Sequence, residues 1–167
     1  KHANKELKTS IYMAGGLGNQ LFQLSYGLHM SKSANLELIG ASKEIHQIIK
    51  SYNNTLLNSK SNSRIFLREE KNYFEKKLRN FLMSRKRQAR RNSFEQNLQR
   101  HVSFIARKIL SKIAQVQEVY VASETGFCGD EVIFPNGDVA CIGYFQSFKY
   151  TGAFESKIAE LLVNALQ

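Results

Sequence analysis

Three glycines and two amide side chains lie close together near the start of the chain, in an arrangement typical of a binding loop. They are Gly15, Gly16, Gly18, Asn19 and Gln20. Glycine adopts positive φ angles and, because it lacks a side chain, lets a ligand approach the backbone. A helix that begins here adds unpaired N–H groups and partial positive charge. The spacing therefore predicts a site for a phosphate or another anion, with the two amides available to a sugar hydroxyl or a phosphate oxygen.

Three interpretations of this loop stay open on spacing alone. It is a structural turn whose glycines only permit tight packing, a dinucleotide-binding fingerprint, or a site for a nucleotide sugar or an acceptor sugar. Gly16 and Gly18 match the first two fingerprint glycines, and Glu37 follows Gly16 by 21 residues, but Leu21 occupies the place of the third glycine. A phosphate-binding P-loop is excluded, because no Gly-Lys-Ser/Thr follows.

The segments around the loop predict a parallel βαβ unit. Residues 9–14, which include the apolar run Ile11-Tyr12-Met13, predict a short buried strand. Residues 21–31 carry apolar side chains at helical spacing, and residues 35–39 predict a second strand. Strand, loop, helix and strand within about 30 residues imply parallel strands joined by a right-handed crossover. Farther along, residues 51–63 are rich in Asn and Ser and predict a loop, and residues 64–117 predict helices.

The last part of the chain returns to strand patterns. Residues 131–134 and 139–145 flank the turn signal Pro135-Asn136-Gly137-Asp138 and predict a hairpin, and residues 154–167 predict a closing helix. Cys128 and Cys141 form no CxxC pair and have no histidine nearby in the sequence. The sequence therefore predicts two free, partly buried thiols and no metal site.

A second polar segment, together with the glycine loop, carries a family resemblance. It reads Gly143-Tyr144-Phe145-Gln146-Ser147-Phe148-Lys149-Tyr150, and the first segment reads Gly15-Gly16-Leu17-Gly18-Asn19-Gln20-Leu21-Phe22-Gln23. In this order, the two segments resemble motifs of the family 11 glycosyltransferases, the α-1,2-fucosyltransferases. The chain departs from that family at Phe148, where Glu is usual, and at Thr151, where an aromatic residue is usual. The family's His-x-Arg-x-Gly-Asp motif is absent from these 167 residues.

The resemblance implies an α/β chain that forms the Rossmann-like first half of a GT-B glycosyltransferase, with residues 64–117 as a helical basic insertion. Residues 1–167 are then the amino-terminal domain, and the donor-binding carboxyl domain lies outside them. We therefore expect the chain alone to be inactive. The implied reaction transfers fucose from GDP-fucose to the 2-hydroxyl of a terminal galactose on a glycan acceptor, with inversion and without a metal or other cofactor.

The resemblance also implies which residues contact the substrates. The loop residues Gly15, Gly16, Gly18 and Asn19 are expected to line a cleft and contact the diphosphate or the fucose, while Gln20 either joins them or braces the loop. A second set lies at the cleft or at the domain junction: Gln146, Ser147, Lys149 and Tyr150. No catalytic base is identified. The carboxylates near the second segment are Glu124, Asp130, Glu131 and Asp138, and a solvated surface position is the simpler interpretation for each.

The net charge of +10 is concentrated in one segment. Residues 64–112 hold 15 Lys and Arg against 4 Asp and Glu, and the densest run extends from Arg85 to Arg91. A solvated linker, contact with an anionic membrane surface and nucleic-acid binding are the three interpretations of this run. The nearby aromatic residues fall on apolar helical stripes, so we expect them in the core and expect no nucleic-acid partner. They are Phe74, Phe81, Phe94 and Phe104.

Two alternatives to a transferase stay open: a non-catalytic basic module that binds membrane or nucleic acid, and a nicotinamide-dependent Rossmann enzyme. No apolar run in the sequence approaches the roughly 20 residues that span a bilayer. We expect a cytoplasmic, peripheral membrane protein, with a membrane-anchored position in the Golgi lumen as the alternative.

Overall fold

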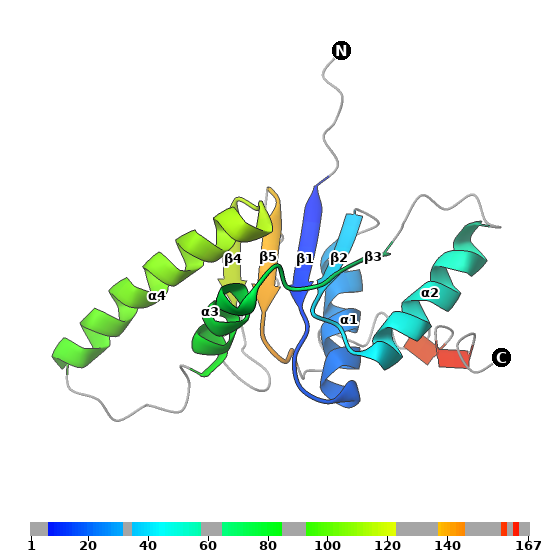
Figure 1. The fold of residues 1–167 in the computed structure, drawn as a ribbon, viewed down its shortest axis with the longest axis horizontal. Coiled ribbons are helices and arrows are strands. Elements are labelled where there is room, and N and C mark those ends of the chain that lie inside the picture. The colour runs from blue at the N-terminus through cyan, green and yellow to red at the C-terminus, as the bar shows by residue number, and fades with distance from the viewer. Residues whose placement is uncertain are drawn as a thin grey trace, which may run out of the picture.

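A computed structural model of the chain describes residues 7–31, 35–57, 65–84, 93–122, 137–145, 158–159 and 162–163. They form an α/β fold in which helices cover both faces of a parallel sheet (Figure 1). In chain order the elements are β1 (Lys8–Tyr12), α1 (Leu17–Ser31), β2 (Asn35–Ile39), α2 (Lys43–Leu57), β3 (Ile65–Arg68), α3 (Tyr73–Ser84), α4 (Ser93–Ala114), β4 (Glu118–Val121) and β5 (Val139–Ile142). This architecture is compatible with a Rossmann-like fold.

The five strands lie in the order β3-β2-β1-β5-β4, and every pair is parallel. Thr9 in the central strand pairs with Leu36 of β2 on one side and with Val139 of β5 on the other. The predicted parallel pairing of residues 9–14 with residues 35–39 is confirmed. The usual dinucleotide-binding order continues from strand 1 to strand 4 and then strand 5. Here β5 lies between β1 and β4, so the last two strands are exchanged.

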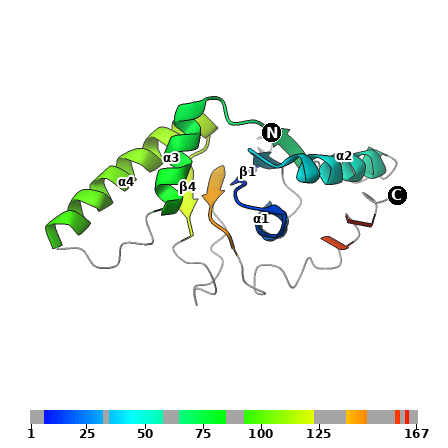
Figure 2. The same cartoon turned by 60° about the horizontal axis from the view of Figure 1, so that its bottom comes forward.

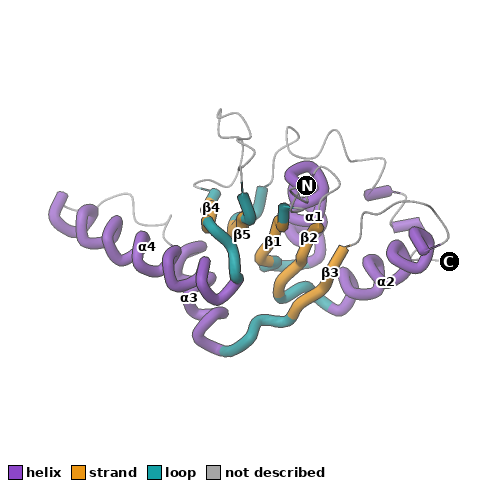
Figure 3. The backbone as a smooth tube through the Cα atoms, turned by 90° about the horizontal axis from the view of Figure 1, so that it is seen from above, coloured by secondary structure: helices purple, strands orange, loops and turns teal. Residues whose placement is uncertain are grey.

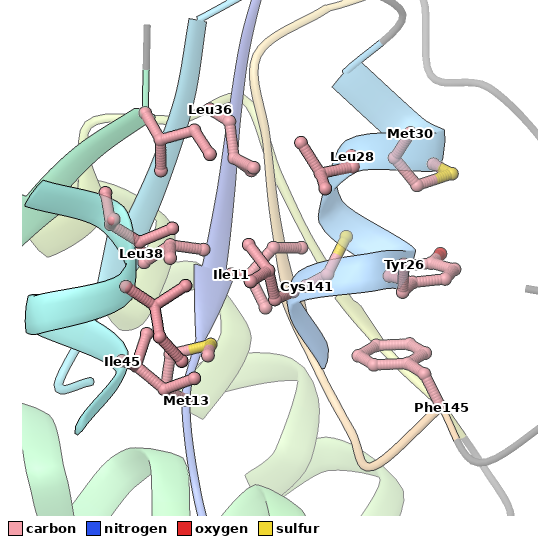
Figure 4. Close-up of a cluster of buried hydrophobic side chains, with 14 of the residues drawn as sticks. Ile11, Met13, Tyr26, Leu28, Met30, Leu36, Leu38, Ile45, Cys141 and Phe145 are labelled. Carbon is pink, nitrogen blue, oxygen red and sulfur yellow. The ribbon is translucent and has the colours of Figure 1, made fainter. Parts of the chain in front are cut away.

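The sheet separates two hydrophobic cores, because both of its faces are covered (Figure 2). On one face, Ile11, Leu38 and Cys141 pack against α1 and α2 (Figure 4). On the other face, Tyr12, Ile39, Ala140 and Ile142 pack against α3 and α4. Strands buried on both faces read as continuous apolar runs, which is why residues 11–14 and 139–142 are recognisable in the sequence.

Two elements in the middle of the chain differ from the prediction. Helix α2 extends to Leu57, into the segment predicted as a loop, because Ile45, Ile48, Ile49 and Tyr52 share one buried side at helical spacing. That burial outweighs the weak helix preference of the Asn and Ser residues around them. Residues 65–68, placed within the predicted helical segment, form the strand β3, whose β-branched and aromatic residues favour an extended backbone.

The predicted hairpin of residues 131–134 with residues 139–145 is wrong at its second strand. Both edges of β5 are already paired, with β1 and with β4, and both pairings are parallel. Residues 131–134 lie outside the described residues, as does most of the predicted closing helix, of which only residues 158–159 and 162–163 are described, as helical. The turn signal at Asn136-Gly137 led to the prediction of an antiparallel partner for β5, whereas its partners are the parallel strands β1 and β4.

The expectation that aromatic residues of the basic segment lie in the core is also wrong for three of them. Phe74 and Phe81 of α3 and Phe104 of α4 are 52%, 39% and 61% exposed. On α4 the side that faces the sheet carries Ala106, Leu110 and Ala114 instead. Phe94 lies in α4, but its side chain is outside the described part of the structure.

None of the helices in the described residues is long and apolar enough to cross a bilayer.

Candidate functional site

The glycine loop lies at the carboxyl end of β1, where the chain turns into α1. Gly15 has a φ of +81°, a conformation that side-chain-bearing residues rarely adopt. A Cβ atom at Gly15 would lie 2.7 Å from Nδ2 of Asn19 and 3.2 Å from Cε1 of Tyr144. The backbone conformation therefore favours glycine here, and any other residue would also have to displace the Asn19 amide. The Asn19 side chain lies over the loop, so Gly15 and Asn19, predicted as site residues, are neighbours.

Gly16 and Gly18 have open space in front of them. Both are exposed, and a Cβ atom added at either would meet no heavy atom within 4 Å. The backbone carbonyl of Gly16 accepts a hydrogen bond from the N–H of Gln20 at 3.1 Å, so the first turn of α1 begins inside the loop. These two glycines leave the backbone at the start of α1 exposed.

Gln20 braces the loop, which was one of the two roles expected for it. Its side chain is 5% exposed, and its Nε2 donates to the carbonyl of Gly15 at 2.9 Å. Its Oε1 accepts from the backbone N–H of Ser42 at 2.9 Å, just before α2 begins. Because both ends of the amide are engaged, Gln20 fixes the shape of the loop and ties it to the next βα connection.

Gln23 is a positioning residue that the sequence reasoning missed. It is fully buried, its Oε1 accepts from the N–H of Ala14 at 2.9 Å, and its Nε2 donates to the carbonyl of Gly143 at 2.7 Å. It therefore joins the ends of β1 and β5, which are neighbours in the sheet. The sequence did contain a signal for this role, because Gln23 falls on the side of the predicted helix that was expected to be buried. Buried polar groups are normally hydrogen-bonded, so an amide there indicates a partner.

The second motif begins directly beside the first. A Cβ at Gly143 would come within 2.6 Å of the Ala122 Cβ, so the chain can pass β4 this closely only with glycine there. Phe145 then turns back with a φ of +52° and stacks on Tyr26 of α1, with ring centroids 3.8 Å apart and planes 3° from parallel (Figure 4). The stack fixes the exit of the second motif against the helix that follows the first.

A cavity of about 870 Å³ lies where these loops meet, at the carboxyl edge of the sheet. Its polar walls come from Gly15, Gln20, Gly143 and Tyr144 of the two motifs and from Arg79 and Asn80 of α3. The remaining wall includes apolar side chains from the strand ends. A concave site with a few convergent polar groups is the usual form of a small-molecule site.

Arg79 brings a guanidinium group to this cavity, and no sequence motif pointed to it. The side chain is buried, its Nη1 donates to the carbonyl of Met13 at 2.5 Å, and its Nε lies 3.2 Å from Oε1 of Glu70. Burial raises the pKa of Glu70, while the neighbouring Arg79 opposes that rise. Arg79 thus holds α3 against the end of β1 and adds a cation to the cavity wall.

The carboxylate of Glu37, a requirement of the dinucleotide interpretation, lies elsewhere. Its Oε2 accepts from the Ser10 hydroxyl at 3.0 Å and lies 3.0 Å from Lys8 Nζ, while its Oε1 is 3.6 Å from Nε of Arg68. Glu37 pairs in register with Ser10 in the middle of β1, not with the strand end that borders the cavity. This placement argues against recognition of a ribose by Glu37 in the cavity.

The other predicted site residues are distributed as follows. The rest of the second predicted set lies outside the described residues: Gln146, Ser147, Lys149 and Tyr150. The same holds for three of the carboxylates, Glu124, Asp130 and Glu131, and for the basic run from Arg85 to Arg91. Asp138 is 9% exposed rather than solvated, so the surface interpretation is wrong for it. Its Oδ1 accepts from the N–H of Lys8 at the amino ends of β1 and β5, the opposite edge of the sheet from the cavity.

The described residues contain no group of three or more His, Cys, Asp or Glu that is placed to hold a metal ion. Cys141 is a free thiol on β5 and is fully buried, and burial raises its pKa to about 12. Cys128 lies outside the described part. The polar groups around the cavity are the backbone of Gly15 and Gly143, the Asn80 amide and the Arg79 guanidinium, which suit a polar ligand.

Comparison of the chain with models of known protein families, with curated protein sequences and with solved structures gives no match.

Proposed function

We propose that this chain is the amino-terminal half of a GT-B galactoside α-1,2-fucosyltransferase, which transfers fucose from GDP-fucose to the 2-hydroxyl of a terminal galactose. The reaction proceeds with inversion, and the donor-binding carboxyl half supplies the remaining wall of the cleft. The proposal starts from the two sequence motifs that resemble the family 11 enzymes, Gly15–Gln23 and Gly143–Tyr150.

One observation carries the proposal: the two motifs, more than 100 residues apart in the sequence, border a single cavity. They meet because β1 and β5 are neighbours, and Gln23 hydrogen-bonds to both strand ends. A turn that served only local packing would need no such convergence. Residues from distant motifs that converge on one concave site favour a shared ligand.

The chemistry of the cavity suits part of a nucleotide-sugar site. The amides at the start of α1 and the partial positive charge of a helix amino terminus favour a diphosphate. Gly16 and Gly18 leave that backbone uncovered. Neither they nor Asn19 line the cavity itself, whose wall takes Gly15 and Gln20 from the loop and the guanidinium of Arg79 from α3. Inverting transfer needs a base for the galactose hydroxyl and stabilisation of the charge that develops on GDP. The described residues supply candidates for the second requirement only.

The decisive measurement is fucose transfer from GDP-fucose to β-galactosides. The chain joined to its carboxyl half should transfer fucose, and the 167 residues alone should not. A Gly16→Val side chain points into open space, so the variant should keep its melting temperature while kcat/KM falls about tenfold or more through obstruction of the donor. Asn19→Ala should lower transfer in the same assay. Lys50→Ala, on the exposed side of α2, is the matched control and should leave the kinetics unchanged.

The proposal fails if the complete protein shows no turnover with several β-galactosides, or if Gly16→Val and Asn19→Ala both leave transfer unchanged. Calorimetry with NADH separates the nicotinamide alternative, because binding to the 167-residue chain would favour that class of enzyme instead.

A further inference from the structure

A line of aliphatic side chains on α4 is exposed, although its spacing is that of a buried helix face. Leu98, Val102 and Ile105 follow one another in steps of four and three, which places them on one side of the helix. They are 56%, 42% and 56% exposed. The same line continues through Ile109, Ile113 and Val116, which are only partly exposed. The apolar line is therefore covered towards the carboxyl end of α4 and open in its amino-terminal half.

The arrangement of the elements explains this difference. The carboxyl end of α4 packs on the sheet, through Leu110 and Ala114 and the neighbouring strand β4. The amino-terminal half of α4 extends past the edge strand β4, and two perpendicular views both show this (Figure 1, Figure 3). No described element covers Leu98, Val102 and Ile105, so a hydrophobic strip borders solvent on a projecting helix.

The charges on the same helix layer all have one sign. Every exposed charged side chain described on α3 and α4 is basic: Lys76, Lys77, Arg100, Lys108 and Lys112. Glu75, the one acidic side chain described on these helices, is fully buried. Lys108 and Lys112 follow Ile105 by three and seven residues, so they lie on the side of α4 that carries the apolar strip. The surface combines aliphatic groups with cations and has no exposed anion among its described residues.

We propose that the amino-terminal half of α4 docks onto membranes that contain anionic lipids. Leu98, Val102 and Ile105 enter the boundary between headgroups and acyl chains, and Lys108 and Lys112 bind the lipid phosphates. A helix with an apolar side flanked by Lys or Arg lies in the membrane interface in this way. A second copy of this surface would oppose cation to cation. The strip itself is aliphatic, and the exposed Phe104 lies on another side of α4, because adjacent residues of a helix point in different directions, so the strip offers single-stranded nucleic acid no stacking face.

The absence of tryptophan from the chain allows a direct test. In Val102→Trp the only indole of the protein lies in the strip, and in Leu7→Trp it lies at a comparably exposed position before β1. With vesicles of phosphatidylcholine and phosphatidylglycerol, the emission of Val102→Trp should shift to the blue and be quenched by brominated acyl chains. The Leu7→Trp control should show neither change, and vesicles of phosphatidylcholine alone should leave both spectra unaltered.

Sedimentation with the same vesicles separates the two contributions. Lys108→Glu combined with Lys112→Glu should lower the partition coefficient about tenfold or more, since each cation at an anionic surface contributes separately. Val102→Gln combined with Ile105→Gln should lower the partition coefficient by a similar factor. Because this variant keeps both lysines, its vesicle binding should stay more sensitive to salt than that of the charge-reversal variant. The charge-matched control is Lys43→Glu with Lys50→Glu on α2, across the sheet, which should bind as the wild type does.

Three results would overturn the proposal: equal binding of the strip variants and the wild type, self-association that the strip variants abolish in the absence of lipid, or tighter binding to an oligonucleotide than to the vesicles. These measurements need neither GDP-fucose nor an acceptor, so the docking surface and the transferase proposal stand or fail separately.

Discussion

At the scale of single residues, the buried carboxylate of Glu75, in the first turn of α3, is held by several hydrogen bonds. Arg68 donates to both of its oxygens, at 2.8 and 3.2 Å, and the Tyr12 hydroxyl donates at 2.6 Å. The backbone N–H of Lys71 donates at 2.5 Å. Burial alone would raise the pKa of Glu75, but these hydrogen bonds together lower it. Burial and the neighbouring Glu75 carboxylate raise the pKa of Tyr12 far above its ordinary value, so Tyr12 remains a donor.

The lowered pKa of Glu75 makes stability depend on acid. Because the folded-state pKa lies below the ordinary value of 4.5, the ionised carboxylate stabilises the fold fully above that value, and the contribution is lost as the pH falls below it. Glu75→Gln should lower the free energy of unfolding at pH 7 by about 2 kcal/mol and flatten its decline on acidification. Urea unfolding at several pH values measures both effects. Glu69→Gln, an exposed neighbour, should change stability by less than about 0.5 kcal/mol.

Cys141 gives a second prediction at this scale. Its side chain is fully buried between the sheet and α1, and burial raises its pKa to about 12. The thiolate is the reactive form of cysteine, so iodoacetamide should leave Cys141 unmodified in the native protein at pH 8 and modify it in urea. Peptide mass spectrometry reads the two states separately for this residue. Rapid modification of Cys141 without denaturant would contradict the placement of β5 in the centre of the sheet.

The residues of the candidate site were only partly predictable. Gly15, Gly16 and Gly18 could be found because glycine has few reasons to recur at the end of a strand. Bracing was one of the two roles expected for Gln20, but its partner Ser42 could not be foreseen. The role of Gln23 could not be foreseen either, because its contact with Gly143 depends on which strands are neighbours and not on local spacing. Arg79 reaches the cavity from a helix whose position follows from the packing of α3 on the sheet.

At the scale of elements, the connection between β1 and α1 depends on one buried amide. Gln23→Met conserves the volume of the side chain but leaves the N–H of Ala14 and the carbonyl of Gly143 without their partner. Each unsatisfied buried group costs about 1–3 kcal/mol, so with two such groups the variant should lose about 2–6 kcal/mol of stability in urea unfolding. Gln47→Met, on the exposed side of α2, is the control for the same chemical change. An unaltered midpoint for Gln23→Met would remove Gln23 from its bridging role.

The predictability of the elements follows the depth of their burial. β1 was predictable from the apolar residues Ile11, Tyr12 and Met13 at its end, and β2 from its leucines and Ile39. The helical pattern of α1 is equally plain. α2 was obscured by polar residues at its exposed positions, and β3 is too short to be separated from the helical pattern that follows it. The apolar line on α4 was recognised as helical, but periodicity alone does not say which side of a helix meets the core.

At the scale of the whole molecule, the two faces of the sheet are covered by helix layers with different surfaces. α1 and α2 cover one face with a core of large aliphatic and aromatic side chains. α3 and α4 cover the other face, and the exposed charged side chains described on these two helices are all basic. The layered α/β class follows from the alternation of strands and helices in the sequence. The strand order does not, because the pairing of β1 with β5 joins residues about 130 positions apart, and no local pattern encodes it.

The position of β5 has a consequence for how the protein is made. The strand that completes the centre of the sheet is the last of the described strands to leave the ribosome, so until then β1 has an open edge and β4 has no described neighbour. Pairings between distant segments form slowly, and open strand edges recruit other chains. A nascent chain halted after β4 should therefore depend on chaperones more than one released after β5.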